Sequence, residues 1–167
     1  DILFGPEQMI RRFVTDPSFD QLICVAIAKH SDFKLEGIED ERTLLHARLI
    51  RDADKLDNCR VKLEESMETL LDMDEKTVGA SPISPKVWES CKAEESVLSA
   101  DRKTGMDYWM SYLALYFDIN FPETYQIIKE QDYIRRIAER VPYSREDTKE
   151  KVAYTVKKLE EKMNIQP

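Results

Sequence analysis

Apolar side chains recur every three or four residues along almost the whole chain, and this spacing constrains the fold more than any other feature. Such a period places these side chains on one face of a helix, whereas strands alternate every second residue. Only four glycines occur in the 167 residues, which disfavours a turn-rich all-β protein and a glycine-rich nucleotide loop. The sequence therefore predicts an all-α fold, a helical bundle of about six to eight helices.

Prolines, glycines and capping residues predict where the helices begin and end. Expected helices run from Pro6 to Val14, about Ser18 to His30, Glu41 as far as Leu71, Pro85 to about Leu98, Gly105 to Ile119, Glu123 to Val141 with a break near Gln131, and onward from a cap at Ser144. Residues 72–86 are expected to form a surface loop, and Asp40 and Thr104 to act as N-caps. The helix over 18–30 is predicted to be central, and that over 105–119 to be buried on several sides.

Composition and charge exclude several classes of function. With 25 basic and 33 acidic residues, the formal net charge is −8, so the surface is unsuited to nucleic acid or an anionic membrane. No apolar run approaches the roughly 18 residues of a membrane span, and no signal peptide is evident. Cys24, Cys59 and Cys91 are odd in number and widely spaced, which indicates reduced thiols and a cytoplasmic location.

The most unusual local sequence is residues 51–58, which place three carboxylates within a helix with apolar flanks. At about 100° per residue, Asp54 and Asp57 share one face, whereas Asp52 points nearly opposite to Asp54. A carboxylate that turns toward a core needs a cation, a metal ion or a helix N-terminus as its partner. The alternative is a set of surface salt bridges with Arg51, Lys55 and Arg60.

Two histidines are the other candidates for chemistry. His30 ends the apolar helix of residues 18–30, where the helix dipole alone would favour a protonated imidazole. His46 lies in the next expected helix, two turns before Asp54 and about 80° round from it. Each also fits a purely structural role, as a helix-end or a partly buried histidine, and spacing alone leaves both readings open.

Two motifs in order resemble the second half of an HD (His-Asp) domain, a family of helical metal-dependent phosphohydrolases. The first is Ala26-Ile27-Ala28-Lys29-His30 at a helix end, and the second is Arg51-Asp52-Ala53-Asp54-Lys55-Leu56-Asp57. The segment DADKLDNCR is also similar to bacterial alarmone hydrolases of this class, and residues 83–135 contain stretches similar to C-terminal helices of bacterial HD proteins. The resemblance implies that Asp54 is the late metal-binding Asp and that His30 is one of the additional histidines.

The resemblance also implies a divalent metal ion, a phosphorylated small molecule such as a nucleotide as substrate, and cations at the phosphate. Lys55 and Arg51 are the candidate phosphate-binding residues, and Asp57 is a further acid near the site. The chain departs from the family pattern in having only two histidines and no His-Asp dipeptide. His30 and Asp54 would supply two ligands, whereas stable catalytic sites usually provide three or more, so weak metal binding and little hydrolysis are expected.

The expected domain organisation is one helical domain over 1–167, a fragment of a longer HD domain whose earlier ligands precede Asp1. Residues 1–71 would form late core helices and 85–167 the C-terminal helices. The alternative function is a non-catalytic helical module that binds a ligand or a protein. Helix faces that lose their partners would expose apolar surface, which predicts a homo-oligomer.

Overall fold

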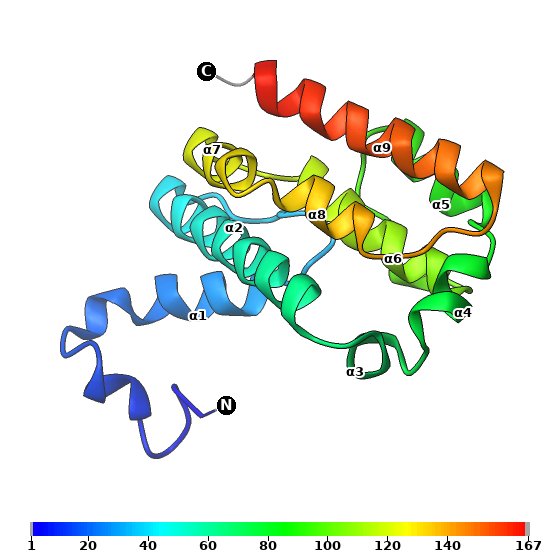
Figure 1. Ribbon diagram of the computed structural model, residues 1–167. Helices are drawn as coiled ribbons and strands as arrows, with labels where there is room; N and C mark the ends of the chain where they lie inside the picture. The colour runs from blue at the N-terminus through cyan, green and yellow to red at the C-terminus, as the bar shows by residue number, and fades with distance from the viewer. Residues whose placement is uncertain (1, 166–167) are drawn as a thin grey trace. The chain divides into compact units, whose positions relative to one another are not determined.

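The computed structural model describes residues 2–165, with the side chain of residue 165 left aside, and over this range it is all-helical (Figure 1). The all-α prediction is confirmed. The chain divides into two compact units, Asp1–Asp54 and Lys55–Pro167, here called unit 1 and unit 2. The division falls inside helix α2, Glu41–Glu64, and not at the loop near residue 72 that separates the two predicted parts.

Unit 1 contains short helical elements and little buried apolar surface. In order, these elements are the 3₁₀ turns η1 (Met9–Arg12) and η2 (Pro17–Phe19), helix α1 (Asp20–Lys29) and the first part of α2. Only Ala26 of α1 is buried, so the prediction that this helix is central is wrong. Asp40 caps α2 as expected, because its Oδ2 accepts from the Thr43 amide at 2.8 Å and the Thr43 hydroxyl at 2.6 Å. These bonds hold the pKa of Asp40 below its ordinary value.

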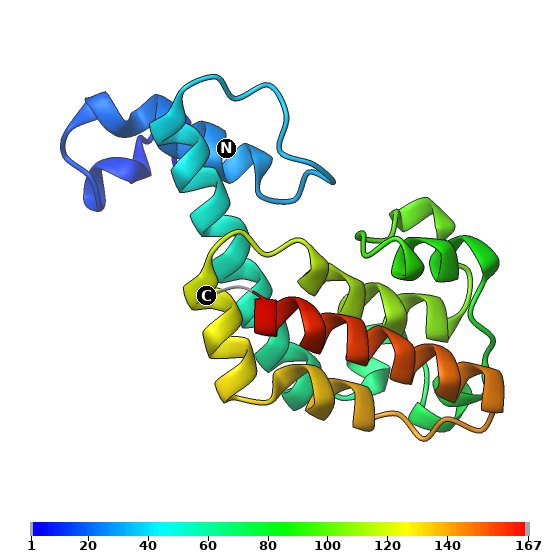
Figure 2. The ribbon, with the colours of Figure 1, turned by 90° about the horizontal axis from the view of Figure 1, so that it is seen from above.

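Unit 2 holds the main apolar core. Its helices after α2 are α3 (Met67–Leu71), α4 (Glu75–Ala80), α5 (Pro85–Lys92), α6 (Gly105–Ala114), α7 (Pro122–Glu130), α8 (Tyr133–Glu139) and α9 (Glu146–Ile165), with 3₁₀ turns η3 (Ser99–Asp101) and η4 (Leu115–Phe117). Helix α9 packs along α5, α6, α7 and α8, as Figure 2 shows. The core gathers the buried apolar side chains of α6 with those of the surrounding helices, among them Trp109, Leu113, Ile128, Ile137 and Leu159.

Helix α6 is buried on nearly every side, as its apolar sequence predicts. Eight of its ten residues are buried, and one of them is the charged Asp107. The helix begins at Thr104, whose side chain accepts from the Asp107 amide at 3.1 Å while the Asp107 carboxylate accepts from the Thr104 amide at 3.1 Å. This reciprocal capping box satisfies backbone donors that a helix start leaves unpaired.

The Asp107 carboxylate also ties α6 to the start of α5. Its Oδ1 accepts from the Ser84 amide at 2.7 Å, and its Oδ2 accepts from the Ser84 hydroxyl at 2.6 Å and the Lys103 amide at 2.9 Å. Asp107 is fully buried, so these donors replace the water that an ionised carboxylate would otherwise need. The side chain therefore fixes two helix starts at once.

The expectation of a surface loop over residues 72–86 is wrong. Asp74 caps α4 by accepting from the amides of Lys76 and Thr77, both at 2.9 Å, and the bonds from Thr77 lower the pKa of Asp74. Val78 and Gly79 of this helix are buried. Gly79 and Pro82 suggest a loop in the sequence, but the glycine is needed for close packing.

Gly79 lies directly against the segment that leads into α9. A Cβ at this position would lie 2.3 Å from the carbonyl oxygen of Pro142 and 3.2 Å from a methyl carbon of Val141. The carbonyl of Gly79 accepts from the Ser144 amide at 3.1 Å. Ser144 thus pairs with α4 and does not cap α9, because the carbonyl of Arg145 accepts the first helical bond of α9 from Lys149.

Gly79→Ala is expected to destabilise the protein. Helix propensity alone would make this change stabilising by about 1 kcal/mol. Overpacking against backbone costs about 1–3 kcal/mol or more, and a carbonyl oxygen cannot rotate away. Chemical denaturation should show a net loss of stability for Gly79→Ala, while Ala80→Gly, at the exposed next position of the same helix, measures the helix-propensity difference alone. A stabilised Gly79→Ala variant would contradict the close approach.

Several other predicted helix limits are too long. The helix expected from Pro6 is a short 3₁₀ turn, α2 ends at Glu64, and Ser66 starts the separate helix α3 by accepting from the Thr69 amide at 3.1 Å. Helix α5 ends at Lys92, well before Leu98. The predicted break near Gln131 is confirmed, because α7 ends at Glu130 and α8 begins at Tyr133. The helix expected near the end of the chain is α9, and its side chains Val152, Leu159 and Met163 are buried.

The three cysteines differ in accessibility. Cys59 and Cys91 are fully buried in unit 2, and burial raises the pKa of each thiol to about 11. Cys24 is exposed in unit 1. Since the thiolate is the reactive form, a disulfide reagent such as Ellman's reagent should label one thiol quickly in the native protein and all three after unfolding. Cys24→Ser should remove the fast phase, and a fast phase that survives this substitution would contradict the burial of the other two.

Candidate functional site

The predicted site residues belong to the end of α1 and to the middle of α2. His30 is the residue that directly follows α1, and Arg51 and Asp54 lie on α2 within unit 1. Lys55 and Asp57 follow on the same helix in unit 2. The geometry of each side chain decides which of them belong together.

Arg51 connects the two helices within unit 1. Its Nη1 donates to the backbone carbonyl of His30 at 3.1 Å and to the carbonyl of Asp32, and the residue is only 6% exposed. The last carbonyls of a helix have no partner within the helix, and a cation there interacts favourably with the helix dipole. Arg51 therefore holds the C-terminal end of α1 against α2, a structural role in addition to the predicted phosphate contact.

Asp54 borders the face of α2 that meets this helix end. It follows Arg51 by three residues, which places its side chain about 60° around the helix and one turn further along. Arg51 binds the backbone carbonyl of His30, and Arg51 lies one turn before Asp54 on α2. The resemblance drawn from sequence combines His30 and Asp54.

The imidazole of His30 has a defined orientation. Its Nδ1 lies 2.7 Å from the carbonyl oxygen of Ile27. A carbonyl can only accept a hydrogen bond, so Nδ1 carries the hydrogen and the neutral ring has its lone pair on Nε2. Metal-binding histidines commonly donate their second ring N–H to a backbone carbonyl in this way, which fixes the tautomer. The Nε2 atom of His30 is therefore prepared to bind a cation or to accept a hydrogen bond.

The three carboxylates of α2 have different environments. Asp52 is 1% exposed, whereas Asp54 and Asp57 are exposed. The acid that faces the protein interior is therefore Asp52, and not Asp54, the acid that the resemblance assigns to the metal. Asp57 accepts from the Nε of Arg60 at 3.0 Å, which confirms the surface salt-bridge reading for this residue. An exposed Asp54 leaves its carboxylate accessible from solvent.

Lys55 is engaged within unit 2. Its ammonium lies 2.8 Å from the Asp118 carboxylate and also donates to the Asp118 carbonyl, which ends η4. The side chain is 6% exposed, whereas that of Asp118 is 42% exposed. Lys55 therefore stabilises the end of the α6–η4 segment, and its predicted contact with a phosphate stays a prediction.

Within residues 2–165, no group of three or more His, Cys, Asp or Glu side chains is gathered closely enough to hold a metal ion. The two donors predicted from the sequence are the imidazole of His30 and the carboxylate of Asp54, a combination that suits zinc, manganese or iron. Two such donors fit the chemistry of a divalent-ion site, and further ligands are needed to complete one.

Comparisons with known proteins identify no relative. No family model matches the sequence, and neither a curated protein nor a solved structure matches the chain. Among the described helices, none combines the length and the apolar character needed to cross a bilayer.

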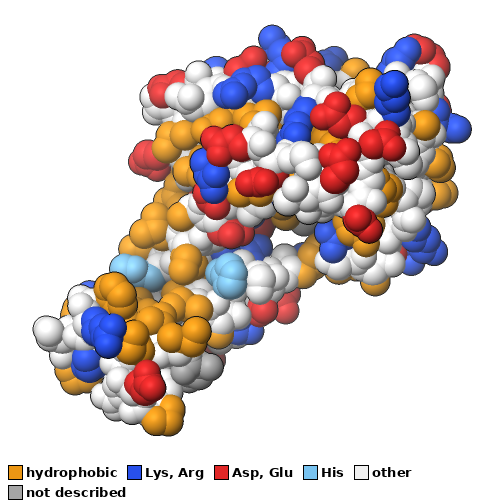
Figure 3. Space-filling view, turned by 60° about the horizontal axis from the view of Figure 1, so that its bottom comes forward, with side chains coloured by type: hydrophobic (Ala, Val, Ile, Leu, Met, Phe, Trp, Pro, Cys, Tyr) orange, Lys and Arg blue, Asp and Glu red, His pale blue; other side chains and the backbone are white. Residues whose placement is uncertain are grey.

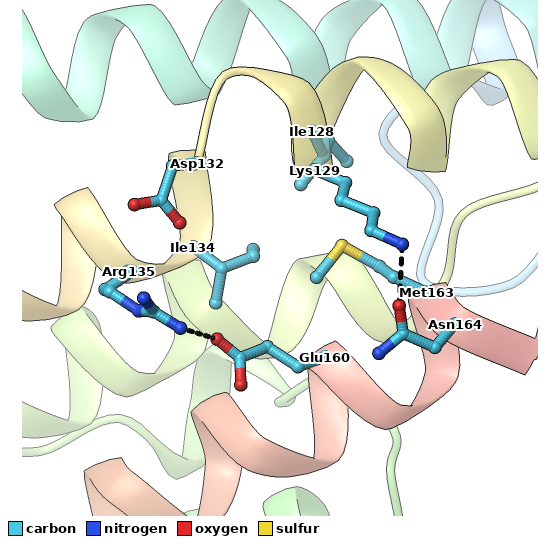
Figure 4. A pocket seen from close by; sticks show the side chains of 8 residues that line it. All are labelled: Ile128, Lys129, Asp132, Ile134, Arg135, Glu160, Met163 and Asn164. Atoms are coloured by element: carbon cyan, nitrogen blue, oxygen red, sulfur yellow. Dashed lines mark hydrogen bonds and ion pairs between the residues drawn. The ribbon is translucent and has the colours of Figure 1, made fainter.

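A second feature, which the sequence analysis missed, is a pair of cavities along α9 in unit 2. The smaller, of about 290 Å³, is lined by Ile128, Ile134 and Met163 with polar side chains around them, and the larger, of about 460 Å³, lies between α8 and α9. Figure 4 shows two bridges to α9 on either side of these apolar side chains, Arg135 to Glu160 and Lys129 to Asn164. Charged side chains of α8 and α9 line the rim, and no local pattern in the sequence predicts the hollow.

Proposed function

We propose that this chain forms the later part of a metal-dependent phosphohydrolase of the HD class, acting on a nucleotide or another phosphate ester. The observation that carries the proposal is the bond from Arg51 to the carbonyl of His30, because it ties the end of α1 to the turn of α2 that precedes Asp54. The tautomer of His30, with its lone pair on Nε2, is the second support.

In this proposal His30 Nε2 and Asp54 bind one divalent ion, and Arg51 steadies the helix end that carries the imidazole. A divalent ion in such an enzyme lowers the pKa of bound water and neutralises charge on the phosphoryl group. The contact of Arg51 with a phosphate remains a prediction from the resemblance, and a guanidinium suits that role because it can bind phosphate oxygens through two parallel N–H bonds. The remaining ligands, an early histidine and a His-Asp doublet, do not occur in this sequence, and the proposal assigns them to other helices of the complete gene product.

Removal of the metal tests this function. The complete gene product is expected to hydrolyse a general substrate such as bis(4-nitrophenyl) phosphate, to lose this activity after chelation, and to regain it with Mn²⁺, Co²⁺ or Zn²⁺, because the ion activates the attacking water. Circular dichroism checks that the protein stays folded after chelation. Hydrolysis that survives complete removal of metal, or no hydrolysis with any of these ions, would overturn the proposal.

A second candidate function is a non-catalytic module that binds a partner protein, with a second copy of the chain as its simplest partner. It is favoured by the apolar side chains that unit 1 exposes, including Phe13 at 76%, Leu45 at 51% and Leu49 at 55%. Figure 3 shows apolar side chains gathered on the surface of this unit. Exposed apolar patches commonly mark interaction surfaces. A strictly monomeric mass by light scattering at high concentration would contradict self-association.

The two candidates differ in the metal assay, since only the enzyme depends on an added ion. The proposal includes a cytoplasmic location, which is expected from the odd number and wide spacing of the three cysteines in the sequence.

A further inference from the structure

We infer that the groove between α8 and α9 binds a long-chain carboxylate, an apolar chain with one anionic head. This inference concerns a different part of the molecule from the proposed phosphohydrolase site and is independent of it. The larger cavity has a volume of about 460 Å³, within the range of small-molecule sites. It lies entirely in unit 2.

The floor of the larger cavity is apolar. Ala138 of α8 and Val141, which follows that helix, lie with Val152 and Val156 of α9 in the lining, and the first three are at most 6% exposed. Tyr143 adds an aromatic face, and its hydroxyl donates to the Ala138 carbonyl, so the polar end of this side chain is satisfied. Such a surface gains free energy by covering an apolar chain.

The smaller cavity continues this groove along α9. Both cavities are lined by Arg135 and Glu160, whose Nη2 and Oε1 atoms lie 2.6 Å apart. This ion pair is the partition between them. The two side chains are 55% and 38% exposed, and ion pairs exposed to this degree contribute little to stability. A ligand chain can therefore displace the pair and extend from one cavity toward Ile134 and Met163 in the other.

The rim of the larger cavity supplies cations for the head group. Lys157 is 74% exposed, and its Nζ lies 3.8 Å from Glu161, too far for a good hydrogen bond, so the ammonium can turn to a carboxylate. Lys149 also lines the cavity, where it donates to Glu146 at 3.1 Å. The acids on the rim are Glu139 and Glu160, and Arg135 balances the charge of Glu160 at the rim whether or not the two side chains stay in contact. The arrangement suits one negative charge at the end of an apolar chain.

Calorimetric titration with sodium dodecanoate, below its micelle concentration, tests the inference on the full chain. Dodecanoate should bind, and Ala153→Trp should weaken binding roughly tenfold or more because the indole fills the larger cavity. Ala153 is exposed, so the helix tolerates the change. Ala93→Trp, at an exposed position at the end of α5, is the matched control and should bind like the wild type.

A charge variant separates head-group recognition from apolar binding. Lys149→Gln with Lys157→Gln should weaken dodecanoate binding but leave binding of uncharged dodecanol unchanged, whereas Lys76→Gln with Lys92→Gln should change neither. The absence of dodecanoate binding, or equal affinity in Ala153→Trp and the wild type, would overturn the inference. Binding only to phosphatidylglycerol vesicles, and not to free dodecanoate, would also overturn it.

Discussion

Asp107→Ala is expected to cost roughly 3–5 kcal/mol of stability, the largest effect of any single substitution considered, because several buried donors lose their acceptor together. The carboxylate accepts from the amides of Ser84, Lys103 and Thr104 and from the Ser84 hydroxyl. All four donors lie at the starts of α5 and α6, and Asp107 itself is fully buried. Alanine leaves these donors without a partner in a place that water reaches poorly.

Urea denaturation of three variants measures this effect. Asp107→Asn keeps the size of the side chain and one acceptor oxygen, so it should recover part of the loss. Thr104→Ala removes one capping oxygen and should cost only about 1 kcal/mol. If Asp107→Ala were no more damaging than Thr104→Ala, the carboxylate would not be the shared anchor of the two helix starts.

If the proposed function holds, Asp54→Ala is expected to reduce phosphoester hydrolysis by the complete gene product on the order of 100-fold or more, because the proposed metal ligand is lost, while the fold survives because the position is exposed. Asp57→Ala is the matched control, because Asp57 is also exposed on α2 and pairs only at the surface with Arg60. The comparison uses the hydrolysis rates of both variants with saturating Mn²⁺, and their melting temperatures show whether each variant stays folded. Full activity in Asp54→Ala would refute the assigned role.

The elements predicted correctly from sequence are those with strong local signals. Helix α6 carries apolar groups on nearly every face and a capping threonine, and α9 repeats its buried residues at a regular helical spacing. The break after Glu130 lies near Gln131, where the helical spacing of apolar residues in the segment 123–141 is interrupted. Local periodicity and capping chemistry decide such elements, and both are visible in the sequence.

The elements that were missed depend on contacts distant in the sequence. Gly79 and Pro82 indicate a loop, yet α4 forms because Asp74 caps it and because the segment near Pro142 packs on its glycine. Helix α1 is apolar, but its burial depends on the surfaces that other segments offer, and only Ala26 is covered.

In the candidate site, too, features set by one helix could be predicted from the sequence, whereas contacts between distant segments could not. Helical geometry correctly separated Asp52 from Asp54, but it could not say which of them faces inward, and Asp52 proved to be the buried one. Arg51 donates to the carbonyls of His30 and Asp32, which lie about twenty residues earlier in the sequence. No local sequence pattern predicts such a contact.

The central claim, that His30 and Asp54 bind one cation, is tested most directly by proton NMR of the histidine rings during titration with Mn²⁺. Paramagnetic broadening reports even weak binding, which two ligands are expected to give. The proposal predicts that the ring signals of His30 broaden well before those of His46, and that Asp54→Ala removes this preference. Equal broadening of both rings, or selective broadening of His30 that persists in Asp54→Ala, would contradict it.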